Sequence, residues 1–151
     1  MKVKGKVLVI EDSSEIKNLL CKTLEDNDYK VFAYNTGSSA ISYIESVSPN
    51  LILLDIKLKD INSFEVCEKM KSIPLVKDIP VIFLSGLINP EITVKGFRLG
   101  AVDFISLPFN ESELLARVGY HIEMHQMKIQ YEKQTSELLK KNIELKVSEE
   151  R

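Results

Sequence analysis

Three short apolar runs constrain this chain more than any other feature of its sequence. They read VLVI at 7–10, LILL at 51–54 and VIFL at 81–84, and all are continuous rather than alternating. A strand with one face in solvent alternates apolar and polar residues, so a continuous run indicates a strand that is covered on both faces. Such strands form parallel sheets between two layers of helices. The runs therefore predict an α/β protein.

Weaker strands are expected at 30–34 and 102–105, and amphipathic helices fall between the strands. Apolar residues spaced three and four apart place these helices around 16–24, 40–44, 64–70 and 90–100. A strand-helix pair that repeats five times in about 120 residues predicts parallel strands joined by right-handed crossovers.

The last predicted helix is unusually long. Asn110 can cap its start, and Glu113 follows three residues later as in a capping box. From there to Arg151 the chain has no proline and a single glycine, Gly119. A helix of up to about 40 residues would be about 60 Å long, more than a domain of this size covers, so roughly the last 25 residues should project or pair.

Composition narrows the possible partners. With a net charge of −2 and a pI near 5.8, the chain has no basic face that would favour nucleic acid. No apolar run reaches the length of a membrane span, and Met1–Gly5 carries no signal-peptide pattern. Cys21 and Cys67 are expected to be packing residues, which suits a cytoplasmic protein.

Polar residues follow the three strong strands directly. Glu11 and Asp12 come after the first, Asp55 after the third and Ser85 after the fourth. Parallel strands end at one edge of the sheet, where ligands bind in such folds. Any one of these acids could be a solvated loop residue, but the set favours a site.

Three like charges in one place require a positive partner. Hard oxygen ligands suit Mg²⁺, which would also assist transfer of a phosphoryl group to a carboxylate. Other chemistries fit poorly, because the chain lacks a glycine-rich turn after the first strand, a P-loop, a Gly-x-Ser-x-Gly turn and an HExxH motif. His121 and His125 are four apart and could share a metal, but no third ligand is expected nearby.

These motifs together resemble the response-regulator receiver domain of two-component signalling. The family has an acidic pair after the first strand, as in VLVIEDSSE, an aspartate after the third, as in LILLDIKL, and Ser or Thr after the fourth, as in VIFLSG. It closes with a segment similar to GAVDFISLPF. The likeness covers roughly residues 4–120. It implies a flavodoxin-like, doubly wound sheet of five parallel strands in the order 2-1-3-4-5, with five helices.

The resemblance also implies roles for individual residues. Asp55 would accept a phosphoryl group from the phosphohistidine of a sensor histidine kinase or a phosphotransfer protein. Asp12, Asp55 and the backbone carbonyl of Lys57 would bind Mg²⁺, and Glu11 would reach the ion through water. Beyond this self-phosphorylation and slow dephosphorylation, no enzymatic activity is expected.

Two further residues would act as the switch. The resemblance implies that Ser85 binds a phosphoryl oxygen, and that Phe104 changes rotamer as the Ser85 loop moves inward. Position alone supports this role for Phe104, since an aromatic residue near a sheet edge is ordinarily part of the core.

The chain departs from the family pattern at two places. The usual lysine before the closing Pro-Phe is Leu107, and the loop after Asp55 reads KDINSFE where Pro-Gly and then Asp-Gly commonly precede Phe-Glu. Either Lys57 or Lys59 could swing an ammonium toward the phosphate in place of the missing lysine. The Leu107–Pro108 bond is expected to be cis, as is typical of the family.

The chain is expected to divide into a receiver domain at 1–120 and an extended helix at 121–151. The helix resembles the linker between a receiver and an output domain, so the chain is either a fragment or a stand-alone receiver that dimerises. A weak parallel coiled-coil dimer is expected. The apolar rows Ile122, Ile129, Ile143 and Met124, Tyr131, Leu138, Leu145 do not form a clean paired seam.

Two functions remain open from the sequence. The first is a phosphoryl-accepting switch, supported by Glu11, Asp12, Asp55 and Ser85. The second is a pseudo-receiver that binds proteins without phosphorylation, supported by Leu107.

Overall fold

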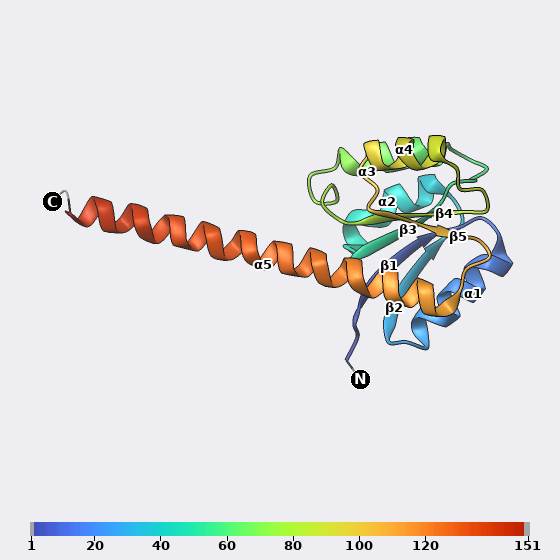
Figure 1. Ribbon diagram of the computed structural model, residues 1–151, viewed down its shortest axis with the longest axis horizontal. Coiled ribbons are helices and arrows are strands. Elements are labelled where there is room, and N and C mark those ends of the chain that lie inside the picture. Colours follow the sequence, from blue (N-terminus) through green and yellow to red (C-terminus); the bar gives the residue numbers. More distant parts are fainter. Residues whose placement is uncertain (1, 150–151) are drawn as a thin grey trace.

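The computed structural model describes residues 2–149 and contains one five-stranded parallel sheet between two layers of helices (Figure 1). The strands are β1 (Gly5–Ile10), β2 (Tyr29–Tyr34), β3 (Leu51–Asp55), β4 (Val81–Ser85) and β5 (Asp103–Ser106). The helices are α1 (Ser14–Glu25), α2 (Gly37–Val47), α3 (Ser63–Lys71), α4 (Pro90–Arg98) and α5 (Glu111–Glu149). The strand order is β2-β1-β3-β4-β5, so the expected class, order and number of helices are confirmed.

The two faces of the sheet bury separate hydrophobic clusters. Along β1, Leu8 and Ile10 face the cluster with α2 and α3, whereas Val7 and Val9 face the cluster with α1 and α5. All four side chains are fully buried. A strand that is covered on both faces has no position for a polar residue, which explains the continuous apolar runs.

Polar side chains at the helix starts fix the loops at the carboxyl edge of the sheet. Each accepts a hydrogen bond from a backbone N–H in the first turn of its helix, and the residues are Ser13, Thr36, Asn62, Asn89 and Asn110. The capping box expected at Glu113 is only half formed, because its carboxylate accepts from Arg117 Nε at 3.1 Å. These caps hold the segments that carry the functional residues.

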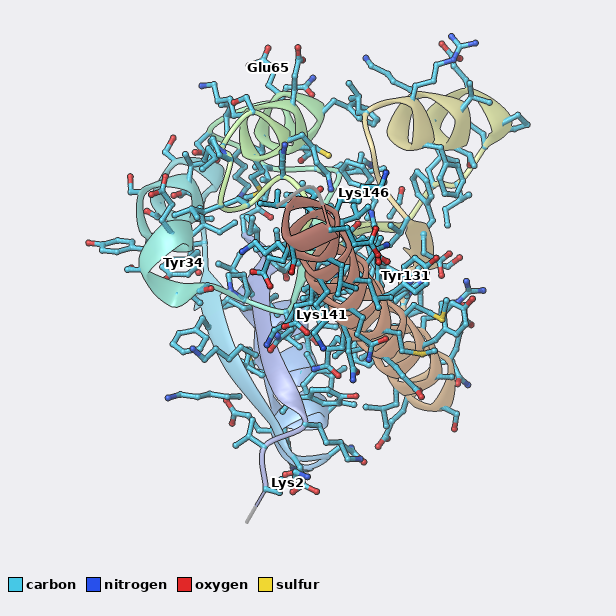
Figure 2. The ribbon with its side chains drawn as sticks, turned by 90° about the vertical axis from the view of Figure 1, so that its left-hand side faces the viewer. Lys2, Tyr34, Glu65, Tyr131, Lys141 and Lys146 are labelled. Atoms are coloured by element: carbon cyan, nitrogen blue, oxygen red, sulfur yellow. The ribbon has the colours of Figure 1, made fainter. Side chains whose placement is uncertain are left out.

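The long final helix is confirmed over its described length. It has 39 residues from Glu111 to Glu149, and the expected continuation to Arg151 falls outside the described residues. Ile122 is its last buried residue, and every residue from 126 to 149 is exposed. The helix therefore projects far beyond the sheet (Figure 1). Figure 2 looks along it, with Tyr131, Lys141 and Lys146 on its projecting part.

Three smaller sequence predictions can be compared with the described residues. The Leu107–Pro108 peptide is cis, as expected. Cys67 is buried, Cys21 is partly buried, and neither forms a disulfide. Within residues 2–149, no helix is both long enough and apolar enough to cross a bilayer.

Candidate functional site

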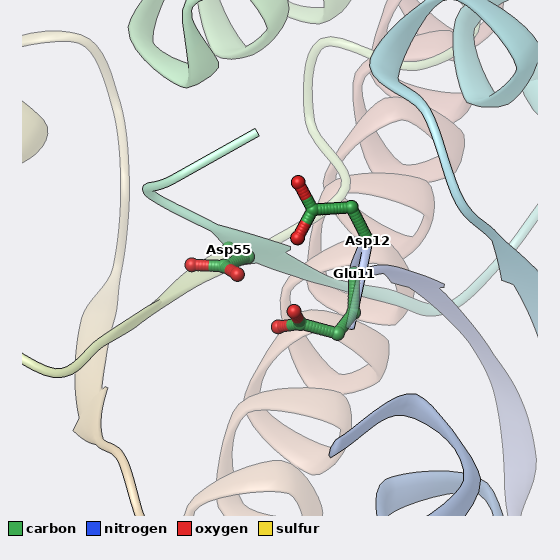
Figure 3. Close-up of side chains that lie close together, drawn as sticks. All are labelled: Glu11, Asp12 and Asp55. Carbon is green, nitrogen blue, oxygen red and sulfur yellow. The ribbon is translucent and has the colours of Figure 1, made fainter. Parts of the chain in front are cut away.

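Three carboxylates meet at the carboxyl edge of the sheet (Figure 3). Glu11 and Asp12 follow β1, and Asp55 is the last residue of β3, the strand that pairs with β1. One oxygen from each side chain lies within 4.8 Å of the others. Glu11 is only 1% exposed and Asp55 only 7% exposed. The convergence predicted from the strand ends is therefore confirmed.

Backbone donors satisfy only part of this cluster. The N–H of Ser13 donates to Glu11 Oε1 and the N–H of Lys57 donates to Asp55 Oδ1, both at 3.0 Å. Within the described part of the chain, Glu11 Oε2 and Asp12 Oδ2 are buried without a hydrogen-bond partner. Burial, and then the neighbouring Asp55 and Asp12 carboxylates, raise the pKa of Glu11 to about 8. The unpartnered oxygens are acceptors that a cation would satisfy.

The donor set fits Mg²⁺. All the available side-chain ligands are carboxylate oxygens, which hard divalent cations prefer, and the partial shell leaves room for the waters that Mg²⁺ keeps. Among residues 2–149, this is the only group of three or more acidic, His or Cys side chains close enough to share an ion. Among the same residues, His121 and His125 belong to no such group, and His121 Nε2 lies 3.0 Å from Asp103 Oδ2.

Ser85 ends β4, next to the strand that carries Asp55. It is buried, and its hydroxyl donates to the carbonyl oxygen of Leu87 at 2.6 Å and accepts from the Leu87 N–H at 3.1 Å. The hydroxyl is therefore bound within its own loop, so binding a new oxygen at the site would require it to exchange partners.

Phe104 lies in the core beneath α4. Its ring stacks on Phe83 at 5.5 Å between centroids and meets Phe97 edge-on at 5.3 Å. At Gly96, a Cβ atom would come within 2.4 Å of the Phe104 ring, so a side chain there would have to displace it. The ring is buried, and its movement would repack the contact between β5 and α4.

Sequence reasoning missed the network around Asp103. Arg117 Nη1 donates to both Asp103 carboxylate oxygens at 2.8 Å, and His121 reaches the same group from the next turn of α5. Burial would raise the pKa of Asp103, but the hydrogen bonds from His121 and Arg117 lower it below its usual value. Arg117 and His121 are four residues apart, so they lie on the same face of α5 and can bind the same group. This spacing is the sequence signal for the network, but it does not identify Asp103 as the partner.

The Leu107 side chain lies among apolar residues. Its side chain is partly buried against the α1–α5 cluster and, with Ile16, Leu19 and Phe109, lines an apolar hollow of about 350 Å³. Lys57 and Lys59 are exposed on the loop after Asp55. Neither lysine forms an ion pair within the described residues.

The sequence matches the family model of the response regulator receiver domain over residues 7–119. Among curated proteins, it is 33% identical over 113 residues to the phosphate regulon transcriptional regulatory protein PhoB of Escherichia coli K12, a match covering 75% of this chain and 49% of PhoB. It is 31% identical over 121 residues to the regulatory protein VanRc of Enterococcus gallinarum, covering 80% of this chain and 51% of VanRc. The chain thus spans about half the length of these relatives.

Solved structures show the same fold. A CheY-like response regulator receiver domain protein from Methanospirillum hungatei JF-1 superposes with a TM-score of 0.77 at 26% identity, covering 84% of this chain and 99% of that protein. NtrX from Brucella abortus superposes with a TM-score of 0.78 at 28% identity, covering 90% of this chain but 30% of NtrX.

The raised pKa of Glu11 predicts how stability depends on pH. Between 4.5 and about 8 the folded protein keeps a proton on Glu11 that the unfolded chain releases. The metal-free protein should therefore lose stability as pH rises through this window, by at most about 1.4 kcal/mol per pH unit, and Mg²⁺ should restore it. Urea unfolding followed by circular dichroism measures both effects.

Glu11→Gln is the control, because it keeps the shape of the side chain and removes the titrating proton. Its stability should vary much less with pH across the same window. Equal pH dependence in the wild type and in Glu11→Gln would show that another group is responsible.

Proposed function

Since the chain belongs to the response-regulator receiver family, we propose that it is a phosphoryl-accepting switch whose acceptor is Asp55. The convergence of Glu11, Asp12 and Asp55, with two buried oxygens unpartnered among the described residues, is the observation that carries this proposal. A solvated cluster of surface acids would keep neither carboxylate oxygen buried and unpaired. The proposed donor is a sensor histidine kinase or a phosphotransfer protein.

Asp55 has the geometry of a nucleophile held in place. The Lys57 N–H binds Asp55 Oδ1, and we propose that the other carboxylate oxygen attacks phosphorus. As the new phosphorus–oxygen bond forms, the bond from phosphorus to the donor histidine breaks, and Asp55 becomes an acyl phosphate. Asp12, Asp55 and the carbonyl of Lys57 would hold Mg²⁺, with Glu11 in support. The ion would neutralise the charge on the transferring group.

The switch would follow from the chemistry at Asp55. A phosphoryl oxygen offers Ser85 a charged acceptor in place of the Leu87 carbonyl that it now binds. When the Ser85 loop moves, it changes the space available to Phe104, which packs against α4. We propose that this is how phosphorylation reaches the surface of the domain.

A receiver that binds partners without phosphorylation is the alternative, and Leu107 is the observation that favours it. This position offers no cation to a phosphoryl group, and its side chain joins an apolar hollow instead.

Phosphorylation of Asp55 is the decisive test. With Mg²⁺ and acetyl phosphate or phosphoramidate, the wild type should gain one phosphoryl group by intact-protein mass spectrometry, and Asp55→Asn should gain none. Asp12→Asn should be slowed because it loses a metal ligand. The exposed Asp26→Asn should behave as wild type.

Failure of the wild type with these donors, together with unchanged amide NMR shifts on adding beryllofluoride and Mg²⁺, would establish the pseudo-receiver instead. Modification of Asp55→Asn to the wild-type extent would show that another residue is the acceptor.

Leu107→Lys tests the missing cation. A lysine ammonium that binds the phosphoryl group should speed phosphorylation by small donors, by roughly tenfold or more for a hydrogen bond to a charged group. Leu107→Met is the matched control, because it keeps the apolar contacts with Ile16 and Phe109 without adding a donor. If Lys57 already supplies the cation, Lys57→Ala will slow the wild type and Leu107→Lys will restore the rate. Equal rates in Leu107→Lys and Leu107→Met would refute the role of a cation at this position.

We propose that the chain divides into a receiver unit at residues 1–120 and an extended-helix unit at residues 121–151, whose first turn still packs on the receiver through Ile122 and whose projecting part starts at residue 126. The exposed apolar side chains of the projecting part include Ile129, Leu138, Ile143 and Leu145, each more than half exposed. A single helix of this kind gains stability by pairing, so we propose that two copies pair in parallel and that the same helix leads to an output domain in a longer protein. The cytoplasm is the proposed location, since it would keep both free cysteines reduced.

Dimerisation through α5 predicts a concentration-dependent mass in analytical ultracentrifugation. Leu138→Glu should shift the chain toward monomer, because it places a charge within an apolar row of the helix. Gln130→Glu adds the same charge to another face of the same helix and should leave the dimer intact. A wild type that stays monomeric at high micromolar concentration, with or without phosphorylation, would contradict the pairing.

A further inference from the structure

The loop between Asp55 and α3 carries two polar side chains at unusual places. Where the family commonly has glycines in this loop, the chain has Asp60 and Ser63. A glycine has no side chain with which to form a hydrogen bond, whereas both of these residues form them in this structure. The two departures therefore have structural consequences.

Ser63 ties the end of the loop to its beginning. It is the first residue of α3, is only 1% exposed, and donates its hydroxyl hydrogen to the backbone carbonyl oxygen of Asp55. This bond joins residues eight apart and closes the loop at its base. Because it is buried, it does not compete with water.

Asp60 ties the middle of the loop to a different element. Its Oδ1 accepts from the Gly37 N–H at 3.1 Å, and its Oδ2 accepts from the N–H of Ser38 at 3.1 Å and from the Ser38 hydroxyl at 3.0 Å. These are donors at the first turn of α2, where the helix dipole also favours a carboxylate. The loop is thus attached to α2 as well as to α3.

Close packing makes this attachment possible. Gly37 is buried, and a Cβ atom at this position would lie only 2.6 Å from methyl carbons of Ile61 and Val66. The start of α2 therefore rests directly on the loop and on α3. A side chain at position 37 would push the start of α2 away from Ile61 and Val66. Glycine allows the close approach that brings the Gly37 and Ser38 N–H groups to the Asp60 carboxylate.

We propose that Asp60 and Ser63 are positioning residues of the metal site, holding the loop so that the Lys57 carbonyl stays beside the Asp55 carboxylate. Lys57 lies between the two anchored points, and its N–H already binds Asp55 Oδ1. A ligand that is held in place before binding loses less conformational freedom when the ion arrives. This inference rests on the proposed function, because it takes the Lys57 carbonyl as a Mg²⁺ ligand.

The test is Mg²⁺ titration of the full chain, followed by the amide NMR shifts of Asp55 and Lys57. Asp60→Ala loses three hydrogen bonds and Ser63→Ala loses one, and each variant should weaken Mg²⁺ binding by about three- to tenfold. Hydrogen exchange of the metal-free protein should also become faster at the amides of residues 57–61. Asn110→Ala is the matched control, since it removes a side-chain acceptor from the start of α5 and leaves this loop intact.

The outcomes separate this inference from the function on which it rests. If the wild type binds Mg²⁺ and both alanine variants bind it as tightly as Asn110→Ala, the positioning role is wrong and the switch proposal stands. Faster exchange without weaker Mg²⁺ binding would also overturn the role, because the tethers would then serve only stability. If the wild type binds no Mg²⁺, both the inference and the metal-dependent function fail. Because Asp60 is exposed, its variant should fold even if the buried Ser63→Ala does not.

Discussion

The close approach of like charges at the sheet edge is the constraint on which this site depends. Adjacent parallel strands end side by side, so Glu11, Asp12 and Asp55 are brought within 4.8 Å of one another. At an effective dielectric near 20, each such pair of charges repels by roughly 3–4 kcal/mol. The metal-free protein relieves part of this repulsion by keeping a proton on Glu11, whose pKa rises to about 8. A cation would take over the role of that proton, so metal binding and proton release are linked.

The edge strand β5 contacts both layers of helices. Its neighbouring residues Asp103 and Phe104 point to opposite sides, as strand geometry requires. Phe104 packs under α4, and Asp103 binds Arg117 and His121 of α5. A displacement of β5 would therefore act on α4 by packing and on α5 by charged hydrogen bonds. From this contact α5, which has 39 residues, continues away from the domain (Figure 1).

The two departures from the family pattern differ in what they do. Leu107 stands where the family usually has lysine, so the proposed phosphoryl site has no cation at this position, and the Leu107 side chain instead packs on the apolar cluster between α1 and α5. Asp60 and Ser63 add hydrogen bonds where the family commonly has glycines. The contacts of these residues show that Leu107 packs in the core, whereas Asp60 and Ser63 tether the loop after Asp55.

The sequence alone determined the sheet, the acidic edge and the length of the last helix. Continuous apolar runs require burial on both faces, parallel strands bring Glu11, Asp12 and Asp55 to one edge, and a chain without proline continues as a helix. Only the tertiary structure decided the partners of Asp60 and Asp103, which lie 23 and 14 residues away along the chain. Local patterns record the periodicity of an element. A side-chain hydrogen bond forms only where the packed elements bring a donor within about 3 Å of an acceptor. The packing of the helices on the sheet therefore decides which donor each acceptor binds.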